Sequence, residues 1–177
     1  MNFGCIISLL KTNHPNVRTS RFKRYLLLLP ALVLAGESLA FGGGLVRAGD
    51  LRHTAREARQ RHLPILLMVS RSHCGFCERM KDEVLKPMLL SGDHDSRVLI
   101  RELRIDPEEW VTDFQGRRLP ASEFSARYQT EVTPTLLFLD PDGNEAAPRI
   151  IGINTVDLLP FYIENALAQA IKRTTER

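Results

Sequence analysis

The sequence predicts an α/β fold in which a central mixed β-sheet is flanked by helices. Three observations support this: a short unbroken apolar segment typical of a buried strand, further strand-like segments alternating with helix-like ones, and a Cys-x-x-Cys motif where the first strand meets a helix. The 177 residues suffice for one domain and a short extra segment, and 44% hydrophobic with 25% charged residues is a globular composition. Most multidomain enzymes and polytopic membrane proteins are thereby excluded.

The N-terminal 40 residues have the order of a secretory signal peptide. A basic segment, 18–24, precedes an apolar run, 25–36, and small side chains follow at Ser38 and Ala40. As a helix the run is about 18 Å long, short of the roughly 30 Å hydrocarbon core, so we expect cleavage and a periplasmic protein. The alternative is an uncleaved membrane anchor that extends across Glu37.

The basic excess of the chain lies in residues 1–40. The formal charge is +3, but this segment holds five Lys or Arg and one acidic residue, which leaves 19 basic and 20 acidic residues in the domain of residues 41–177. No basic cluster interleaved with aromatic residues follows, so we expect no nucleic-acid partner.

The number and spacing of the cysteines favour a chemical role over a structural framework of disulfides. Cys5 lies in the leader, which leaves Cys74 and Cys77 as the only cysteines of the exported domain. A bridge across so short a loop constrains the unfolded chain very little.

The first two elements follow from their apolar patterns. Residues 50–62 predict a surface helix capped by Asp50. The unbroken apolar run 65–69 then predicts a strand buried on both faces, which leads to Cys74. The residues of the helix that should face inward are Leu51, Ala55 and Ala58.

A helix is predicted over residues 75–90, directly after the first cysteine of the motif. Arg79 is placed to pair with Glu83 one turn later, and Pro87 predicts a kink. One face of this helix is apolar and comprises Cys77, Met80, Val84 and Met88.

The middle of the domain carries weaker signals. Residues 98–105 predict a strand that is half apolar and half charged, hence less covered than the first. Residues 106–120 are consistent with either a small hairpin or an ordered loop, and 122–129 predict a short helix.

The last part of the domain predicts a hairpin and a helix. Strand 135–139, the turn 140–143 and strand 149–151 form the hairpin. The final helix is predicted to begin at a cap, Asp157, and to end at Ile171. Pro160 falls in its first turn, and its inward face comprises Leu159, Ile163, Ala166 and Ala170.

The strand-to-helix junction places Cys74 where a thiolate is favoured. A helix N-terminus exposes unpaired N–H groups and a partial positive charge, which stabilise an ionised sulfur. The Cys74 thiolate could then attack a substrate disulfide, and Cys77, more buried and one turn further on, could resolve the mixed disulfide. Gly75 leaves Cys74 accessible.

The sequence disfavours other uses of the pair. Zinc generally takes four ligands, and the available histidines lack a paired spacing, so we expect no metal. Haem attachment would require His directly after Cys77, where Glu78 stands. A purely structural bridge is disfavoured by the short loop. The four histidines of the domain are His53, His62, His73 and His94.

The motif and its context resemble the thioredoxin superfamily, and within it the exported SoxW-type thioredoxins. The resemblance covers about residues 50–171 and rests on the segment 72–77 after an apolar strand, a helix containing Pro87, and Thr133-Pro134 at the start of a strand. It implies that Pro134 is cis and lies beside the Cys pair, with the Thr133 backbone pairing with a substrate chain. The substrate-binding residues it implies are Gly75, Phe76, Thr133 and Pro134.

The sequence departs from reducing thioredoxins in three places. His73 and Phe76 stand where the family has Trp and Pro, and Met68 replaces a buried Asp, so Cys77 lacks the familiar acid. Glu78 is a candidate replacement, although a solvated helix carboxylate is the simpler interpretation. His73, when protonated, could lower the pKa of Cys74. The Gly-Phe pair and Thr133 are nearer to disulfide isomerases.

The resemblance implies a periplasmic thiol-disulfide oxidoreductase without a cofactor. We expect a monomer that reduces disulfides in exported client proteins and receives electrons from a membrane thiol-disulfide transducer. One alternative is isomerase or oxidase activity. The other is a non-catalytic redox-sensing or metal-binding module, in which Trp110, Phe114 and Phe76 would form an apolar docking surface.

Overall fold

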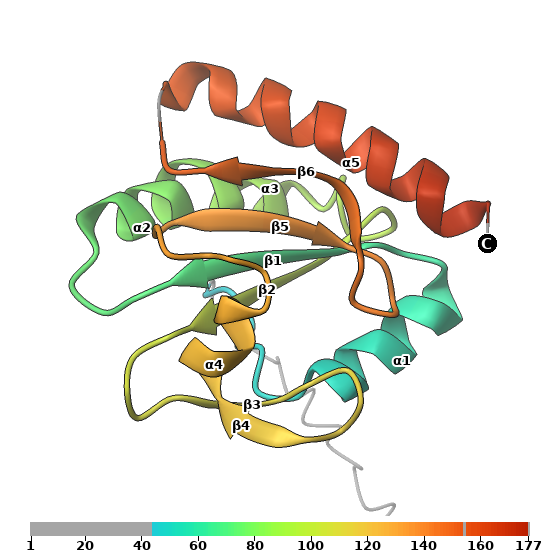
Figure 1. The fold of residues 1–177 in the computed structure, drawn as a ribbon. Helices are drawn as coiled ribbons and strands as arrows, with labels where there is room; N and C mark the ends of the chain where they lie inside the picture. Colours follow the sequence, from blue (N-terminus) through green and yellow to red (C-terminus); the bar gives the residue numbers. More distant parts are fainter. Residues whose placement is uncertain (1–43, 154, 177) are drawn as a thin grey trace, which may run out of the picture. The chain divides into compact units, whose positions relative to one another are not determined.

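The computed structural model describes residues 44–153 and 155–176. The expected signal peptide and Cys5 lie outside the described residues. The domain is built on a four-stranded sheet in the order β2-β1-β5-β6 (Figure 1). Strands β1 and β2 are parallel and the other two pairs are antiparallel, so the predicted mixed sheet is confirmed. The strands are β1 (Ile65–Ser70), β2 (Leu99–Arg104), β5 (Thr135–Leu139) and β6 (Glu145–Ile151).

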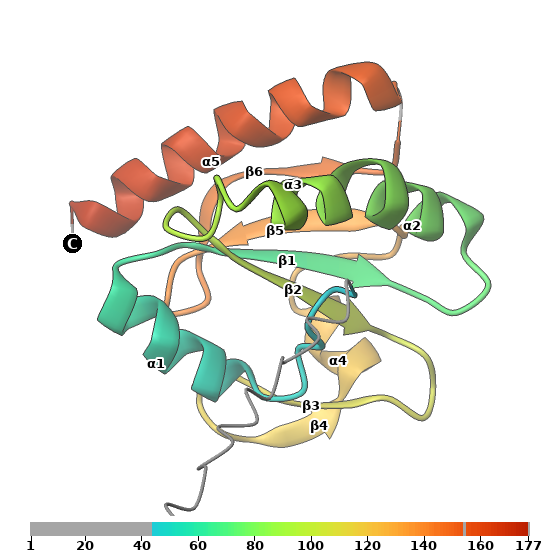
Figure 2. The same cartoon turned by 180° about the vertical axis from the view of Figure 1, so that it is seen from behind.

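Helices cover both faces of this sheet. One face packs against a continuous helical segment, residues 75–91, and against α5 (Leu159–Thr175). The other face packs against α1 (Leu51–Arg61), α4 (Ala121–Ala126) and a hairpin (Figures 1 and 2). That hairpin consists of β3 (Trp110–Thr112) and β4 (Arg118–Pro120), which answers the question left open for residues 106–120.

The two strands of the parallel pair, β1 and β2, differ in burial. All six residues of β1 are buried, as predicted for a central strand with both faces packed. Strand β2 lies at the sheet edge and is less covered than β1, as predicted, since Arg101 and Arg104 are only partly buried, yet Glu102 is buried. The reason is a segment that runs along this edge: the Glu102 N–H donates to the Val46 carbonyl (2.9 Å) and the Ala48 N–H donates to the Glu102 carbonyl (2.8 Å).

The segment 75–91, hereafter the redox helix, comprises α2 (Gly75–Met80), a π-helical turn η1 (Lys81–Leu85) and α3 (Lys86–Ser91). Pro87, where a kink is predicted, lies two residues after this wider turn, in which the Lys86 N–H donates to the Lys81 carbonyl. The predicted pair of Arg79 with Glu83 is present at 3.0 Å. Its predicted apolar face is confirmed, since Cys77, Met80, Val84 and Met88 are all buried.

The observed starts of α1 and α5 can be compared with the predicted cap residues. Asp50 Oδ1 accepts a hydrogen bond from the His53 N–H (2.8 Å), which confirms the cap of α1. The cap predicted at Asp157 is wrong, because Asp157 lies inside a 3₁₀ turn, η2 (Val156–Leu158), and α5 begins at Leu159. Pro160 does occupy the first turn, and the predicted inward residues Leu159, Ile163, Ala166 and Ala170 are buried.

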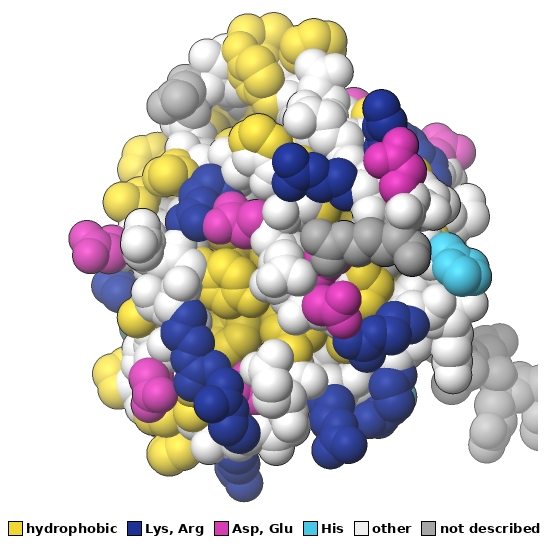
Figure 3. Space-filling view, turned by 45° about the vertical axis from the view of Figure 1, so that its right-hand side comes forward, with side chains coloured by type: hydrophobic (Ala, Val, Ile, Leu, Met, Phe, Trp, Pro, Cys, Tyr) yellow, Lys and Arg dark blue, Asp and Glu magenta, His cyan; other side chains and the backbone are white. Residues whose placement is uncertain are grey.

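The surface mixes charges of both signs with exposed apolar side chains. Figure 3 shows basic and acidic side chains side by side on one face, and apolar side chains at its top, over the first turns of α5. The exposed large apolar residues at that place are Leu158, Phe161 and Tyr162. Within residues 44–153 and 155–176, no helix has the length and apolar character needed to cross a bilayer.

Candidate active site

The two cysteines of the motif form a disulfide at the start of the redox helix. Cys74 is the N-cap residue, in extended conformation, and its Sγ accepts a hydrogen bond from the Cys77 N–H at 3.1 Å. The position predicted for Cys74 is therefore confirmed: a backbone N–H of the first helical turn points at its sulfur.

The two sulfurs differ in their access to solvent. Cys77 is fully buried and belongs to the core that packs between the sheet and the redox helix, whereas Cys74 is only partly buried. Gly75 is exposed, with no atom within 4 Å of the position that a Cβ would occupy. Phe76 is 63% exposed. Cys74 can therefore be reached from solvent, whereas Cys77 cannot.

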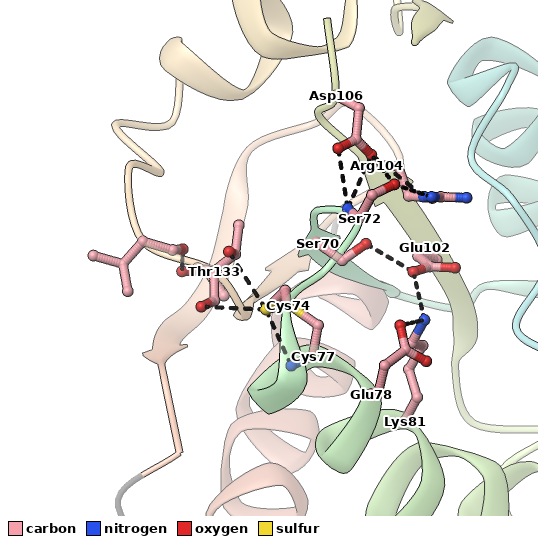
Figure 4. The surroundings of a disulfide bond; sticks show 12 residues. Ser70, Ser72, Cys74, Cys77, Glu78, Lys81, Glu102, Arg104, Asp106 and Thr133 are labelled. Atoms are coloured by element: carbon pink, nitrogen blue, oxygen red, sulfur yellow. Dashed lines mark hydrogen bonds and ion pairs between the residues drawn. A yellow bond between two sulfur atoms is a disulfide. The ribbon is translucent and has the colours of Figure 1, made fainter. Parts of the chain in front are cut away.

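The loop before β5 lies against Cys74. The Thr133–Pro134 peptide bond is cis, as expected from the resemblance. The Thr133 carbonyl oxygen is 3.8 Å from the Cys74 Sγ, and the Thr133 hydroxyl donates to the same sulfur at 3.7 Å (Figure 4). The Pro134 carbonyl accepts from the Gly152 N–H (2.8 Å), which ties this loop to the end of β6.

Asp106 holds the chain just before the motif, a role that sequence reasoning missed. Its two carboxylate oxygens accept from the Ser72 N–H at 3.0 and 3.1 Å, and Oδ2 also accepts from the Ser72 hydroxyl at 3.0 Å. Arg104 contacts both residues. Burial by itself would raise the pKa of Asp106, but the Ser72 hydrogen bonds and the Arg104 charge outweigh burial and lower the pKa.

Neither of the two possible modulators, His73 and Glu78, forms a hydrogen bond with a motif sulfur among the described residues. His73 is exposed and adopts a left-handed backbone conformation (φ 56°). No hydrogen bond between described residues joins its ring to Cys74 or Cys77. Glu78 is directed to Lys81, with 2.7 Å between its Oε1 and Nζ. Glu78 is therefore an exposed helix carboxylate paired with Lys81, in agreement with the simpler interpretation of its sequence position.

A further carboxylate near the motif, Glu102, is buried and was also missed by sequence reasoning. Glu102 Oε1 accepts from the Ser70 hydroxyl (2.7 Å) and forms an ion pair with Lys81 (3.2 Å). Together with Glu78 these residues form what we call the Glu102 cluster, which lies to one side of the disulfide in Figure 4. Strand alternation could have located Glu102, because it stands two residues after the buried Ile100.

The other sequence candidates lie elsewhere. Phe114 packs against Phe124 (ring centroids 6.2 Å apart), and Trp110 lies under Arg118 on the β3–β4 hairpin. Phe114 packs against the core on the opposite face of the sheet from Cys77, so Phe114 and Phe76 do not belong to one docking surface. Among the described residues, no group of three His, Cys, Asp or Glu is placed to hold a metal ion.

Comparison with known proteins gives both family and fold. Residues 51–166 match the family described as the thioredoxin-like domain. Two chloroplast thioredoxin-like proteins of Nicotiana benthamiana, CITRX1 and CITRX2, are each 28% identical over 109 residues, which is 61% of this chain and 51% of theirs. The chain thus spans about half the length of the curated relatives it matches. The structure of DsbH oxidoreductase is similar in fold, with a TM-score of 0.54 at 20% identity, over 70% of this chain and 85% of that chain.

Proposed function

The chain belongs to the thioredoxin-like domain family, and from this premise we propose that it is a thiol-disulfide oxidoreductase whose active pair is Cys74 and Cys77. One observation carries the proposal. The disulfide lies at a helix N-terminus with one sulfur reachable from solvent and the other buried. This asymmetry suits a reaction in which one sulfur attacks a client and the other completes the exchange.

The reaction has two steps. In the reduced protein, the Cys74 thiolate attacks one sulfur of a client disulfide, forms a mixed disulfide and releases the first client thiolate. Cys77 then loses its proton and attacks the Cys74 sulfur, which restores the Cys74–Cys77 disulfide and releases the second client thiolate. Two electrons pass from the pair to the client.

The Cys77 N–H is placed to make the first step fast. It already lies 3.1 Å from the Cys74 Sγ in the disulfide, and as a donor it favours the charged form of that sulfur after reduction. The exposed Phe76 and the Thr133 backbone flank Cys74 and are our proposed contacts for an extended client segment.

We assign the direction as reduction. A strong oxidant of this type owes its potential to extra stabilisation of the reduced thiolate form. Phe76, between the cysteines, brings no charge to supply that stabilisation, and the described residues show no hydrogen bond from His73 to the pair. The leader-like pattern of residues 18–40 supports an exported protein. Its electrons would come from a membrane thiol-disulfide transducer, as in a SoxW-type monomer.

The direction is tested by the reduction potential against glutathione together with the rate of insulin reduction. A reductase should lie toward the thioredoxin end of the range, which runs from about −270 to −120 mV, and should reduce insulin catalytically. A potential near the oxidising end, together with no insulin reduction, would reject reduction as the direction.

A further inference from the structure

Three carboxylates of the described domain are buried, and two of them have a local structural role. Asp113 accepts hydrogen bonds from the backbone N–H groups of Gln115 and Arg117, so it closes the turn of the β3–β4 hairpin. Asp140 does the same for the turn before β6, where it accepts from the Asn144 N–H. Glu102 is 6% exposed and lies within a strand, where no turn requires it. A buried carboxylate in such a place calls for another explanation.

Glu102 lies on the sheet face that carries the buried sulfur. Its neighbour in register on β1 is Met68, which belongs to the same core as Cys77. Its ion-pair partner Lys81 follows Cys77 by four residues, so both project from one face of the redox helix. Ser70, the third contact, ends β1 four residues before Cys74. The cluster therefore joins β2 to the strand and the helix that meet at the motif (Figure 4).

The charges of the Glu102 cluster do not balance. Lys81 Nζ is 2.7 Å from Glu78 Oε1 and 3.2 Å from Glu102 Oε1, so two carboxylates share one ammonium group. Burial by itself would lower the pKa of Lys81, but its bonds and attraction to Glu78 and Glu102 outweigh burial and raise the pKa. Lys81 thus stays charged, and the cluster carries one net negative charge that a single proton would neutralise.

One oxygen of Glu102 is available for that proton. Oε1 already accepts from Ser70 and contacts Lys81, whereas Oε2 makes no hydrogen bond within the described residues. Every fully buried side-chain nitrogen or oxygen of these residues has a partner, so Oε2 must reach accessible space. Glu102 also lines a hollow of about 70 Å³ together with Arg47 and Arg104, through which water can approach.

We propose that Glu102 accepts the Cys77 proton, through intervening water, when Cys77 attacks the mixed disulfide. The inference rests on the proposed function and completes its second step. The proton leaves Cys77 Sγ for Glu102 Oε2, the Cys77 sulfur forms its bond to Cys74 Sγ, and the client sulfur leaves with the electron pair of the broken bond. Glu102 returns the proton to solvent before the next cycle. Lys81 and Ser70 hold Oε1, which keeps Oε2 in place.

The test separates the two steps in a single reaction. The reduced protein is mixed with an aromatic disulfide whose thiolate is coloured, so the first equivalent of colour reports attack by Cys74 and the second reports resolution by Cys77. With Glu102→Gln, which keeps the side-chain shape, we expect the second phase to slow about a hundredfold near neutral pH, at the lower end of general-base effects. The first phase should change less than threefold.

The pH profile distinguishes a proton acceptor from a structural residue. In the unsubstituted protein the second phase should be level near neutrality, whereas in Glu102→Gln it should rise about tenfold per pH unit as hydroxide takes over. Glu83→Gln is the matched control, because it removes an exposed carboxylate of the same helix that pairs with Arg79 outside the Glu102 cluster, and its second phase should remain level. Glu78→Gln, which removes the other carboxylate of the cluster, is measured beside it. If Glu102→Gln does not fold, Glu102→Asp retains a carboxylate and should show a slower but still level second phase.

The outcomes are distinguishable from those of the proposed function. Two phases in the unsubstituted protein with an unchanged second phase in Glu102→Gln would overturn the role of Glu102 and leave the redox pair intact. A second phase that is slowed in Glu78→Gln but not in Glu102→Gln would assign the proton to Glu78 and would also overturn the role of Glu102. Absence of the first phase in the unsubstituted protein would overturn the active pair itself. Failure to reduce insulin, with both phases present and the second slowed in Glu102→Gln, would reject only the direction.

Discussion

The carboxylate of Asp106 holds Ser72 through both its backbone N–H and its hydroxyl, two residues before Cys74. The contact joins the end of β2 to the loop that delivers the motif, which also contains the left-handed His73. A left-handed conformation is unfavourable for a residue with a side chain, so this loop needs external support. Asp106 supplies it.

Asp106→Asn should therefore destabilise the domain by about 1–2 kcal/mol at neutral pH, since it weakens hydrogen bonds to a charged acceptor. Because the pKa of Asp106 is lowered in the folded state, its contribution is present above the unfolded value near pH 4 and is lost as pH falls through the folded pKa. Urea unfolding between neutral and acidic pH should show a shallower pH dependence in Asp106→Asn. Equal slopes for the two proteins would contradict the assignment.

Single substitutions of the cysteines separate their roles. Cys74→Ser should abolish disulfide exchange, because Cys77 is fully buried and out of reach of a client. Cys77→Ser should instead accumulate mixed disulfides through Cys74, because the resolving thiol is missing. Non-reducing electrophoresis with mass spectrometry of the adducts measures both, and Cys74→Ser serves as the control for nonspecific capture. Adducts in the Cys74→Ser protein, or none in Cys77→Ser, would show that the roles are wrongly assigned.

Local patterns predicted most of the fold. The buried run at β1, the apolar face of the redox helix and the hairpin of β5 and β6 each follow from a period or a turn contained within one segment. The position of Cys74 at the helix start follows in the same way. The failure at Asp157 is local as well, because a 3₁₀ turn precedes α5 and takes the place of the expected cap.

The contacts around the motif could not be predicted in this way. Asp106 and Ser72 are 34 residues apart, and Glu102 and Ser70 are 32 apart. Both contacts exist because β1 and β2 pair in parallel in one particular register, with Met68 beside Glu102. Register depends on the packing of both sheet faces, which no single segment encodes. The burial of Glu102 depends further on the segment that covers the edge of β2.

A glycine is required at position 143 both by the backbone conformation and by the lack of room for a Cβ atom. Its φ is 87°, and a Cβ at this position would lie 2.6 Å from the Phe114 ring. Gly143→Ala should lower the free energy of unfolding by more than Gly92→Ala does. Gly92 has φ 73°, but no atom lies within 4 Å of the position that a Cβ would occupy, so Gly92→Ala should lose only about 1–2 kcal/mol, from left-handed backbone strain. Overpacking against Phe114 should add about 1–3 kcal/mol. Urea unfolding of the two variants measures the difference, and equal losses would refute the contact.

Tyr128 should make the domain sensitive to alkaline pH. Burial, reinforced by the charges of Glu145 and Asp140, raises the pKa of Tyr128 to about 12, and its hydroxyl donates to the Gly143 carbonyl at 2.7 Å. A phenol whose folded pKa is raised contributes stability that is complete below its unfolded pKa of about 10 and is lost as pH rises through about 12.

Tyr128→Phe tests this sensitivity because it removes the hydroxyl and keeps the ring. At neutral pH it should cost about 1 kcal/mol, since the Gly143 carbonyl loses its partner. Between about pH 10 and 12, the free energy of unfolding of Tyr128→Phe should fall less steeply than that of the unsubstituted protein. The variant lacks the phenol that stays protonated in the folded state and ionises on unfolding in this range. Phenolate absorbance of the folded protein should lose its latest-titrating component in this variant, while Tyr162→Phe, on the exposed start of α5, should leave that component in place. Loss of the late component in Tyr162→Phe instead would show that Tyr128 is not the buried phenol responsible.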